Sequence, residues 1–375
     1  DPSKLFTCNS YYLDFCSGGK LWKDSLLDLF NLQSSRSPDD PLEEQHLNIA
    51  SSLQKATEII FENILMKCSS YGKNLVYSGG VALNCKANRF IPNYFDNYFI
   101  QPASNDAGAS LGAIYSIFPK KSPVDLFPSL LSPFNPYLGS SYNEQECYEY
   151  AASQGFENVY LDNSADVESI AAKYLAEGNI IARYTGRTEF GPRALGNRSI
   201  LADPGYLGMQ QRLNIAVKKR EGFRPFAPVV NEEDFSTYFS GSKNFHMLMT
   251  AVSKTYIPPS TDQPRLLLDS ILSSTLKTDK LFPSAVHVDG SARVQCINKS
   301  LSPSLHKLLV EFKSIRGYGV LLNTSFNLRG EPIVRSFEDA FHCFQYTDID
   351  FLWIGNKIFR KSSTYAISES FFTPD

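Results

Sequence analysis

The sequence predicts an α/β protein of two domains. Two stretches in its first third run from a short apolar strand through a polar turn into a helix, at 74–90 and 98–118. Two later stretches, 166–187 and 304–344, again alternate helix with strand. Strands alternating with helical segments are typical of α/β sheets, and 375 residues exceed the length of one ordinary domain.

The elements of the first third follow from spacing and turn residues. Apolar residues recur at helical spacing over 39–72, which predicts one long amphipathic helix. The run "NLVYS" (74–78) predicts a strand, and a helix is expected over 81–90. In 98–118 a short strand precedes a polar turn and a helix of small residues that begins near Gly108.

A segment with five prolines and no clear period, 119–141, separates the two halves. We therefore expect a first domain over 1–118, a linker over 119–135 and a second domain over 136–375. Within the second domain, 166–187 reads as a helix ending near Gly178 and then a strand. The stretch 304–344 reads as helix, strand, polar loop and helix.

Composition limits the classes of partner. The net charge is −3, so there is no global electrostatic basis for binding nucleic acid or an anionic membrane, and no apolar run reaches the length of a membrane span. The cysteines are scattered without a CxxC pair, which favours a reducing, cytoplasmic location. The sequence begins with Asp1 instead of methionine, which suggests a piece of a longer protein. The seven cysteines are Cys8, Cys16, Cys68, Cys85, Cys147, Cys296 and Cys343.

Three segments of the second domain gather basic and polar residues beside glycines. They are "GRTEFGPRALGNRSILADP" (186–204), "VKKREGFRPFAP" (217–228) and "NTSFNLRG" (323–330). Guanidinium groups bind phosphate oxygens in two-pronged fashion, and hydroxyl and amide groups satisfy the remaining acceptors. For any single arginine, an ion pair with an acid such as Glu189 or Glu221 is the simpler explanation. For the whole set, a site for a phosphorylated ligand is the better one.

These segments also resemble a known family. Together with "SGGVALNCKAN" (78–88) and "QPASNDAGASLGA" (101–113), they are similar to the hallmark segments of the NodU/CmcH family of O-carbamoyltransferases. The resemblance runs from about residue 40 to the C-terminus. It implies the second subdomain of an actin-like ATPase (ASKHA) fold over 1–118, followed by a YrdC-like α/β domain with a twisted sheet over 136–375.

The resemblance also implies a reaction in two steps. The YrdC-like domain would condense ATP with carbamoyl phosphate to give carbamoyl adenylate. The actin-like domain would then transfer the carbamoyl group to a hydroxyl of a secondary metabolite, as in antibiotic biosynthesis, or of a glycan. The expected partners are carbamoyl phosphate, ATP and a small hydroxyl acceptor, with neither nucleic acid nor membrane involved. Mg²⁺ is expected to bridge the nucleotide phosphates.

The family motifs assign roles to particular residues of the second domain. Arg193, Lys218 and Arg224 match basic residues around carbamoyl phosphate and the ATP phosphates, and Ser325 matches the serine of the SxN element; these four form the expected catalytic set. The remaining residues expected to bind substrate or nucleotide in this domain are Arg187, Arg198, Arg293, Asn323 and Asn327.

In the first domain the resemblance implies a nucleotide loop and a metal ligand. Gly79, Gly80 and Asn84 match the nucleotide loop, although a Gly-Gly pair alone is typical of any tight turn. Asp106 matches an aspartate that binds iron or another divalent ion in the family. By itself, an aspartate before "AGASLGA" is typical of a helix N-cap.

The sequence departs from the family pattern in its histidines. The family's metal centre also uses a closely spaced histidine pair, but no two histidines of this chain share a helical turn. We therefore expect the metal centre to be incomplete, and carbamoyl transfer to need an N-terminal half as a partner. The five histidines are His46, His246, His287, His306 and His342.

Two other functions remain open at this point. A tRNA-modifying enzyme of the threonylcarbamoyl-adenylate type would share both domain types, but the acidic balance of the chain argues against a tRNA-binding surface. An inactive scaffold remnant that lacks the transfer site is the other alternative. The presence together of Arg193, Lys218, Arg224, Ser325 and Asn327 argues against that second alternative.

Overall fold

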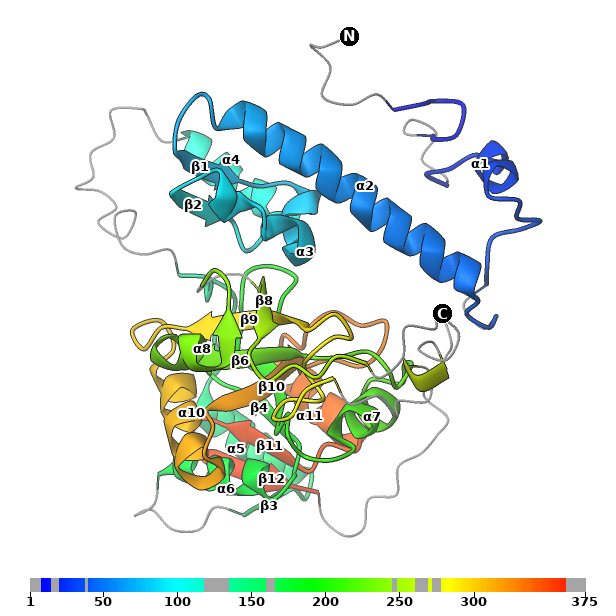
Figure 1. Ribbon diagram of the computed structural model, residues 1–375. Coiled ribbons are helices and arrows are strands. Elements are labelled where there is room, and N and C mark those ends of the chain that lie inside the picture. Colours follow the sequence, from blue (N-terminus) through cyan, green and yellow to red (C-terminus); the bar gives the residue numbers. More distant parts are fainter. Residues whose placement is uncertain are drawn as a thin grey trace. The chain divides into compact units, whose positions relative to one another are not determined.

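The computed structural model divides the chain into two compact units (Figure 1). The first is Asp1–Asn74 with Asn93–Asp96, and the second is Leu75–Pro92 with Asn97–Asp375. Nearly all of the predicted linker at 119–135 lies outside the described residues, so the domain boundary stays a prediction. The structure describes residues 8–14, 20–37, 40–117, 135–159, 166–244, 248–259, 269–271 and 278–361.

The first unit is built around one long helix. After the short helix α1 (Asp24–Leu29), helix α2 extends over Glu44–Cys68, which confirms the long helix predicted at 39–72. It begins later than predicted because Glu43 caps it: the Glu43 side chain accepts a backbone N–H from the first turn, and the Glu43 N–H donates to His46 Nδ1.

The second unit opens with a two-stranded sheet and short helices. Strand β1 (Asn74–Tyr77) pairs with β2 (Asn97–Ile100), and both strands were predicted. The single helix expected over 81–90 is wrong, because Asn84 interrupts it and caps its second half by accepting the Ala87 N–H at 3.1 Å. The remaining elements here are η1 (Gly80–Leu83), α3 (Cys85–Asn88), η2 (Ile91–Asn93) and α4 (Ala107–Ile117).

Ten of the described strands form one mixed sheet, in the order β3-β12-β11-β4-β5-β10-β6-β9-β8-β7. Two neighbouring pairs, β4 with β11 and β6 with β9, are parallel, and the others are antiparallel. The predicted α/β class is therefore confirmed. The strands are β3 (Glu157–Asn158), β4 (Ile181–Tyr184), β5 (Arg198–Ala202), β6 (Ala227–Asn231), β7 (Phe239–Ser240), β8 (Met249–Ser253), β9 (Ser291–Ile297), β10 (Val320–Ser325), β11 (Phe351–Ile354) and β12 (Lys357–Arg360).

Helices pack against this sheet. Helix α10 lies beside α6 and contacts β6 and β10, and α11 contacts β4 and β11. The predicted sequence of helix, strand, loop and helix over 304–344 is confirmed by α10, β10 and α11. No helix in the described part of the chain combines the length and apolar character needed to cross a membrane. The helices are α5 (Glu144–Ser153), α6 (Val167–Ala176), α7 (Met209–Arg212), η5 (Leu213–Val217), α8 (Glu232–Tyr238), α10 (Pro303–Arg316) and α11 (Phe337–Gln345).

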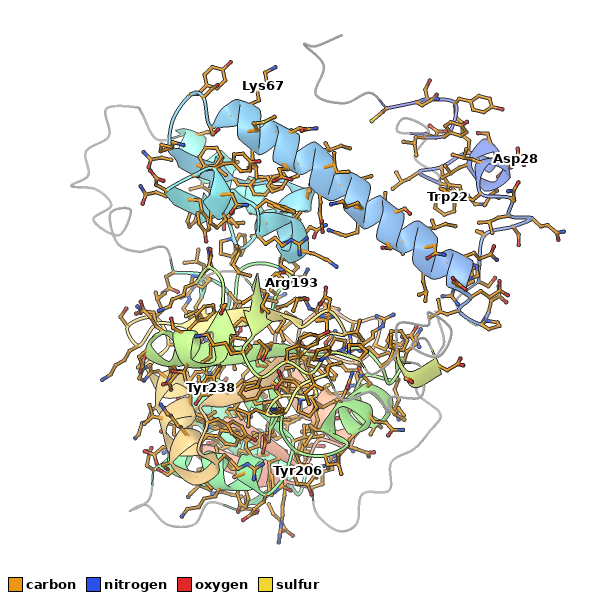
Figure 2. The ribbon with its side chains drawn as sticks, viewed as in Figure 1. Trp22, Asp28, Lys67, Arg193, Tyr206 and Tyr238 are labelled. Atoms are coloured by element: carbon orange, nitrogen blue, oxygen red, sulfur yellow. The ribbon has the colours of Figure 1, made fainter. Side chains whose placement is uncertain are left out.

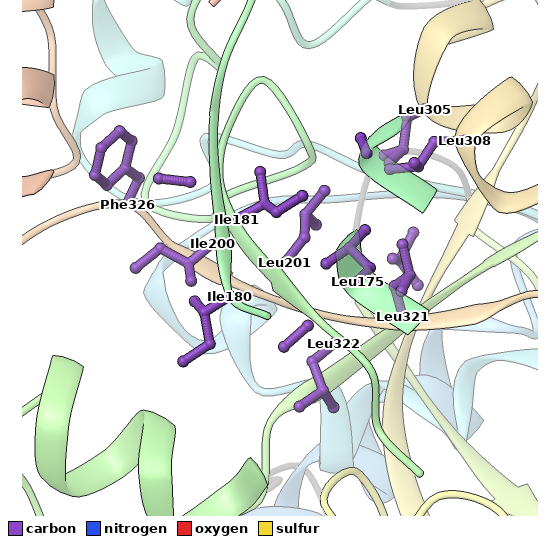
Figure 3. Packing of buried hydrophobic residues seen from close by; sticks show 14 of the residues in the cluster. Leu175, Ile180, Ile181, Ile200, Leu201, Leu305, Leu308, Leu321, Leu322 and Phe326 are labelled. Atoms are coloured by element: carbon purple, nitrogen blue, oxygen red, sulfur yellow. The ribbon is translucent and has the colours of Figure 1, made fainter. Parts of the chain in front are cut away.

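The core lies where the central strands meet their helices (Figure 3). Ile181 on β4 is in register with Leu201 on β5, and Leu322 on β10 is in register with Ala202. All four of these side chains are fully buried. Burying each large aliphatic side chain contributes about 1.5–3 kcal/mol. The central strands β4, β5 and β10 therefore form a rigid support for the loops that leave their ends.

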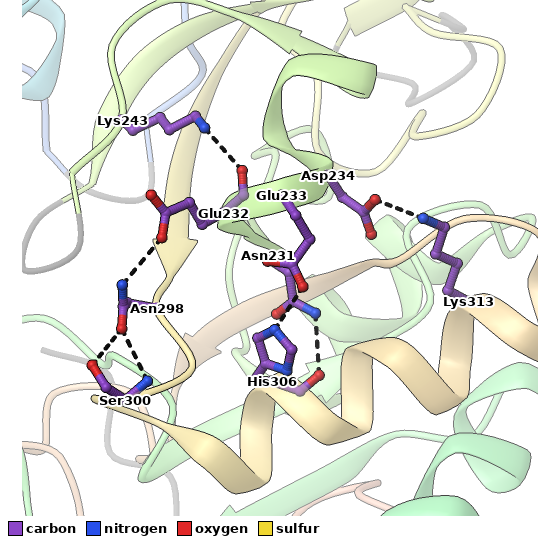
Figure 4. A network of polar contacts seen from close by, with 9 residues as sticks. All are labelled: Asn231, Glu232, Glu233, Asp234, Lys243, Asn298, Ser300, His306 and Lys313. Carbon is purple, nitrogen blue, oxygen red and sulfur yellow. Dashed lines mark hydrogen bonds and ion pairs between the residues drawn. The ribbon is translucent and has the colours of Figure 1, made fainter.

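A polar network ties α10 to the segment that follows β6 (Figure 4). His306 Nε2 lies 2.7 Å from Glu233 Oε1, and Lys313 Nζ lies 2.6 Å from Asp234 Oδ1. The Asn231 side chain also donates to the His306 carbonyl. His306 is thus a satisfied structural histidine, and these contacts fix α8 against α10.

Two arginines of the central strands are buried as part of the core. The Arg183 guanidinium lies over the Trp353 ring at 4.8 Å and donates to the Gly196 carbonyl. The Arg198 guanidinium lies 3.8 Å from the centre of the Tyr184 ring and donates to three backbone carbonyls, those of Thr185, Gly186 and Asn197. These arginines hold the loop between β4 and β5 in place.

Replacing Arg198 with alanine should lower the free energy of unfolding by about 3 kcal/mol or more, because a fully buried side chain is lost and three backbone carbonyl oxygens lose their donor. The measurement is urea denaturation followed by the fluorescence of Trp353 in a Trp22→Phe background. Arg187→Ala, at an exposed position of the same loop, serves as the matched control and should change stability by less than about 1 kcal/mol. Equal stability of the two variants would contradict a structural role for Arg198.

Candidate functional site

The centre of the candidate site is Lys218, at the end of a π-helical turn. Its Nζ donates to Asn327 Oδ1 at 2.8 Å, to Ser325 Oγ at 3.3 Å and to the Ser325 carbonyl. Ser325 is the last residue of β10, and its hydroxyl donates to Asn327 Oδ1 at 2.6 Å. These hydrogen bonds join Lys218, Ser325 and Asn327 into one preorganised cluster. π-helical turns such as the one before Lys218 are frequently found at functional sites.

Burial sets the protonation of Lys218. The side chain is 7% exposed, and within the described residues no carboxylate lies within ion-pair distance of its Nζ. Burial, with a smaller contribution from the charge of Arg220, lowers the pKa of Lys218 to about 7. An anion bound beside Lys218 would favour the charged ammonium and raise this pKa again.

Beside Lys218 the backbone turns sharply. Lys219 has a φ of 46°, in the left-handed region that residues with a Cβ rarely adopt. The turn carries the chain from Lys218 to Arg220, and both side chains line one small cavity of about 210 Å³. We call it the lysine cavity; it is lined by Lys218, Arg220, Glu221, Arg224, Ser325, Asn327, Leu328 and Arg329.

A larger cavity of about 430 Å³ shares Arg220 and Arg224 with the lysine cavity and adds Arg293. Burial and the two neighbouring arginines lower the pKa of Arg220 to about 10. The buried Nε of Arg293 has no partner among the described residues. This arginine cavity thus concentrates positive charge, and it is lined by Gln210, Arg220, Phe223, Arg224, Pro225, Ser270, Ile271, Thr278, Pro283, Val286, His287, Val288 and Arg293.

The arginine cavity also has an uncharged part. Burial and the nearby Arg293 lower the pKa of His287 to about 4, so its imidazole is neutral at physiological pH. Phe223, Val286 and Val288 add apolar surface to the same walls. A cavity with an apolar part and three arginines suits a ligand that combines a flat ring with phosphates.

A third depression, the outer groove, shares Ser325 and Asn327 with the lysine cavity. Its volume is about 920 Å³, and Arg187 lines it. The lysine cavity therefore lies between the arginine cavity and the outer groove and shares residues with each. The groove is lined by Leu138, Gly139, Ser140, Arg187, Thr188, Glu189, Phe190, Gly191, Pro192, Ser325, Asn327, Glu331, Pro332, Ile333 and Arg335.

The remaining predicted residues of this domain take other positions. Arg193 (labelled in Figure 2) lines none of the three cavities. Burial lowers the pKa of Arg293, and the charge of Arg193 contributes to this shift. Arg198 is buried in the core, and its guanidinium is bonded to carbonyls. Asn323 is buried within the sheet, where its amide donates to Gln295 Oε1 at 2.5 Å. The structure brings Lys218, Arg224, Ser325 and Asn327 together, with Arg293 next to them.

Of the two acids expected as ion-pair partners of the arginines, Glu221 forms such a pair and Glu189 binds backbone N–H groups. Arg224 Nε forms an ion pair with Glu221 at 2.9 Å, but both side chains are about half exposed, so the pair contributes little and can exchange for a ligand. Glu189 instead accepts the backbone N–H groups of Leu195, Asn197 and Arg198 through its Oε1. The loop that carries Arg193 thus closes around a buried carboxylate.

The predicted residues of the first domain occupy two neighbouring turns. Gly79 has a φ of 106° and donates its N–H to the Ser104 carbonyl, and Asn84 caps α3. Asp106 is exposed and directly precedes α4. Among the described residues no three His, Cys, Asp or Glu side chains lie close enough together to hold a metal ion.

Two residues that line these cavities, His287 and Arg335, were not among the predicted site residues, because no pattern along the chain distinguishes them and only the folded structure brings them there. Arg220 lies in a basic segment that was expected to bind a phosphorylated ligand, but it had no role of its own. Glu189 was expected only as an ion-pair partner of an arginine.

The protein is thus of the α/β class, and basic side chains gather in its lysine and arginine cavities. Residues 3–115 match the family model for the carbamoyltransferase N-terminus, and residues 172–361 match the model for the carbamoyltransferase C-terminus. The chain therefore belongs to the carbamoyltransferase family, and its predicted resemblance to the NodU/CmcH group is confirmed.

Several curated proteins are similar to the chain. An uncharacterized protein of Synechocystis is 35% identical over 96% of this chain and 59% of its own length. The nodulation protein NolO of Bradyrhizobium diazoefficiens is 36% identical over 86% of this chain and 56% of its own length. The 3'-hydroxymethylcephem-O-carbamoyltransferase of Streptomyces clavuligerus is 30% identical over 85% of this chain and 55% of its own length. The chain thus spans little more than half the length of these relatives.

Similarity to solved structures is low. A structure of full-length HypF in the phosphate- and nucleotide-bound form is 15% identical, with a TM-score of 0.34, over 68% of this chain and 35% of that one. The actin-like and YrdC-like assignments therefore stay predictions.

The pKa of Lys218 generates a prediction about anion binding. If a bound anion contacts the charged ammonium, binding takes up a proton above pH 7, so affinity should fall about tenfold per pH unit between pH 7.5 and 9. Sulfate is a suitable probe because it does not titrate in this range, and calorimetry gives its affinity. His287, with a pKa of about 4, and Arg220, with a pKa of about 10, keep their charge states over most of this range.

Two variants separate the contribution of Lys218. Lys218→Arg should bind sulfate with little pH dependence, because its guanidinium stays charged, and Lys218→Met should bind weakly at every pH. A wild-type affinity that is flat between pH 7.5 and 9 would contradict the combination of a lowered Lys218 pKa and contact between Lys218 and the anion.

Proposed function

We propose that this chain forms carbamoyl adenylate from ATP and carbamoyl phosphate in its basic cleft, for transfer of the carbamoyl group to a hydroxyl of a secondary metabolite or glycan. The observation that carries the proposal is the convergence of Lys218, Arg220, Arg224 and Arg293 on two adjoining cavities beside Ser325. Membership of the carbamoyltransferase family supports the choice of group transferred.

ATP would occupy the arginine cavity. The apolar surface of Phe223 and Val288 suits the adenine ring, and the three arginines suit the phosphates. The free Nε of Arg293 supplies a donor for which the described residues provide no acceptor. The reacting α-phosphate would then lie toward the lysine cavity, where Arg220 and Arg224 line both spaces.

The reaction consumes one water and releases two products besides the adenylate. Water cleaves carbamoyl phosphate to carbamate and inorganic phosphate. A carbamate oxygen then attacks the α-phosphorus of ATP, so that one O–P bond forms, the bond to the β-phosphate oxygen breaks, and pyrophosphate leaves. Arginine and lysine charges would stabilise the negative charge that moves onto the leaving pyrophosphate. Lys218, held by Ser325 and Asn327, would help to stabilise this negative charge through its ammonium group.

Mg²⁺ would enter with the nucleotide. Glu221 is the single carboxylate among the described residues that line the arginine and lysine cavities, and it is paired with Arg224. This set does not form a protein cage for Mg²⁺, which commonly binds through substrate phosphates and retained waters instead.

Arg224→Ala should lower pyrophosphate release from ATP and carbamoyl phosphate by about 100-fold or more, because a phosphate-binding charge is lost from the cleft. The measurement is a coupled pyrophosphate assay, with one inorganic phosphate expected per pyrophosphate. Arg360→Ala is the control: this exposed arginine pairs with Glu157 at the sheet edge, and its loss should leave the rate unchanged.

The same assay separates the proposed function from the tRNA-modification alternative. Threonine with bicarbonate replaces carbamoyl phosphate in a second reaction. Pyrophosphate release with threonine and bicarbonate, but not with carbamoyl phosphate, would favour a threonylcarbamoyl-adenylate enzyme. Release with neither donor would reject adenylate formation by this chain.

A further inference from the structure

Asn214 lies in the middle of a row of polar residues on the helix that leads to Lys218. Helix α7 continues directly into the π-turn η5, and Gln210, Asn214 and Lys218 follow one another at intervals of four residues. Residues four apart are neighbours on the surface of a helix. Gln210 lines the arginine cavity and Lys218 lines the lysine cavity, whereas Asn214 is fully buried and lines neither. Adenylate formation as proposed makes no use of Asn214.

The Asn214 side chain binds the segment 218–224, which carries three of the basic residues that line the two cavities. Its Nδ2 donates to the Gly222 carbonyl at 3.0 Å and to the Arg224 carbonyl at 2.8 Å. Its Oδ1 accepts the Arg220 Nε–H at 2.7 Å, and its backbone carbonyl accepts the Arg220 N–H at 3.0 Å. Both donors of this buried amide are thus used. One side chain therefore fixes the path of the backbone between Arg220 and Arg224.

The same bonds set the orientation of the Arg220 guanidinium. Its Nε is held by Asn214, and its guanidinium carbon lies 4.9 Å from the centre of the Phe226 ring. Contact with a ring and an acceptor on Nε together restrict both the plane and the rotation of the group. Arg220 lines both cavities, and no carboxylate of the described residues forms an ion pair with it. The two terminal nitrogens are therefore left to bind an anion.

A brace of this kind is needed because the arginines repel one another. Burial and the charges of Arg224 and Arg293 disfavour the charged form of Arg220, which lowers its pKa to about 10. On a free segment the side chains would move apart toward water, where this repulsion is weak. A neutral amide holds them without cancelling their charge, whereas a carboxylate at the same position would compete with a bound anion.

We propose that Asn214 is a positioning residue for anion binding: it touches no ligand itself and acts by holding the guanidinium of Arg220 toward the two cavities. The inference rests on the proposed function for the identity of the anion, which is a phosphate of ATP. Inorganic sulfate replaces ATP as the probe in the binding tests, so these tests do not depend on adenylate formation.

Asn214→Leu removes the hydrogen bonds of the side chain at nearly constant volume. We expect its sulfate affinity, measured by calorimetry on the folded protein, to fall about tenfold or more. Asn231→Leu is the matched control, since Asn231 is also buried and donates to a carbonyl, that of His306, outside the two cavities. The control should lower stability but keep sulfate affinity within twofold. Sulfate affinity within twofold of wild type in both variants would overturn the positioning role.

A double-mutant cycle shows whether Asn214 acts through Arg220. In an Arg220→Met background, Asn214→Leu should weaken sulfate binding by less than about threefold, because the group that Asn214 orients is already gone. A loss of the same size in both backgrounds would contradict action through Arg220.

Arg220→Lys tests orientation without changing Asn214, and it decides the matter if Asn214→Leu does not fold. Lysine keeps the charge but has neither Nε nor a planar fork. We expect its sulfate affinity to lie within about threefold of that of Arg220→Met. Wild-type affinity in Arg220→Lys would show that charge alone suffices and would overturn the proposal.

Pyrophosphate release separates this inference from the proposed function. Weakened sulfate binding in Asn214→Leu, together with a wild-type protein that releases no pyrophosphate, would support the positioning role and reject adenylate formation. Unchanged sulfate binding in Asn214→Leu, together with normal pyrophosphate release by the wild type, would overturn the positioning role alone.

Discussion

The site depends on burying the amino group of Lys218 against the end of strand β10. A lysine that is 7% exposed, with no described carboxylate in ion-pair range, is kept in place by neutral oxygens of Ser325 and Asn327. These oxygens satisfy its donors without cancelling a charge. The positive charge of Lys218 is therefore not cancelled by a described carboxylate, and the cluster is not a closed ion-pair network.

The arginines near this cluster divide into two classes by the acceptors that surround them. Arg183 and Arg198 are buried among backbone carbonyls and aromatic rings, so their guanidinium groups are part of the structure. Arg220, Arg224 and Arg293 line one cavity, and burial together with the charges of the other two arginines lowers the pKa of Arg220 to about 10. Like charges are held close only where a rigid fold enforces it, and such crowding is typical of sites that bind anions.

Glu189 orders the loop between β4 and β5. One carboxylate oxygen accepts three backbone N–H groups, while the other is buried and has no hydrogen-bond partner among the described residues. The same side chain thus supports the loop that carries Arg187 and Arg193. A loop ordered by a carboxylate keeps its exposed arginines in fixed positions, which reduces the entropy lost when a ligand binds.

The sequence by itself determined the α/β class, the strands β1, β2, β4 and β10, and the motifs by which the chain belongs to the carbamoyltransferase family. It also determined the helices α2, α4, α6, α10 and α11. These features are local: they depend on periodicity, turn residues and short spacings such as the one between Ser325 and Asn327. The tertiary structure alone decided which basic residues face a cavity. Arg198 belongs to the same sequence motif as Arg187, yet it is the first residue of β5, pairs with Tyr184 and is buried in the core. Arg187 lies in the loop between β4 and β5 and lines the outer groove instead.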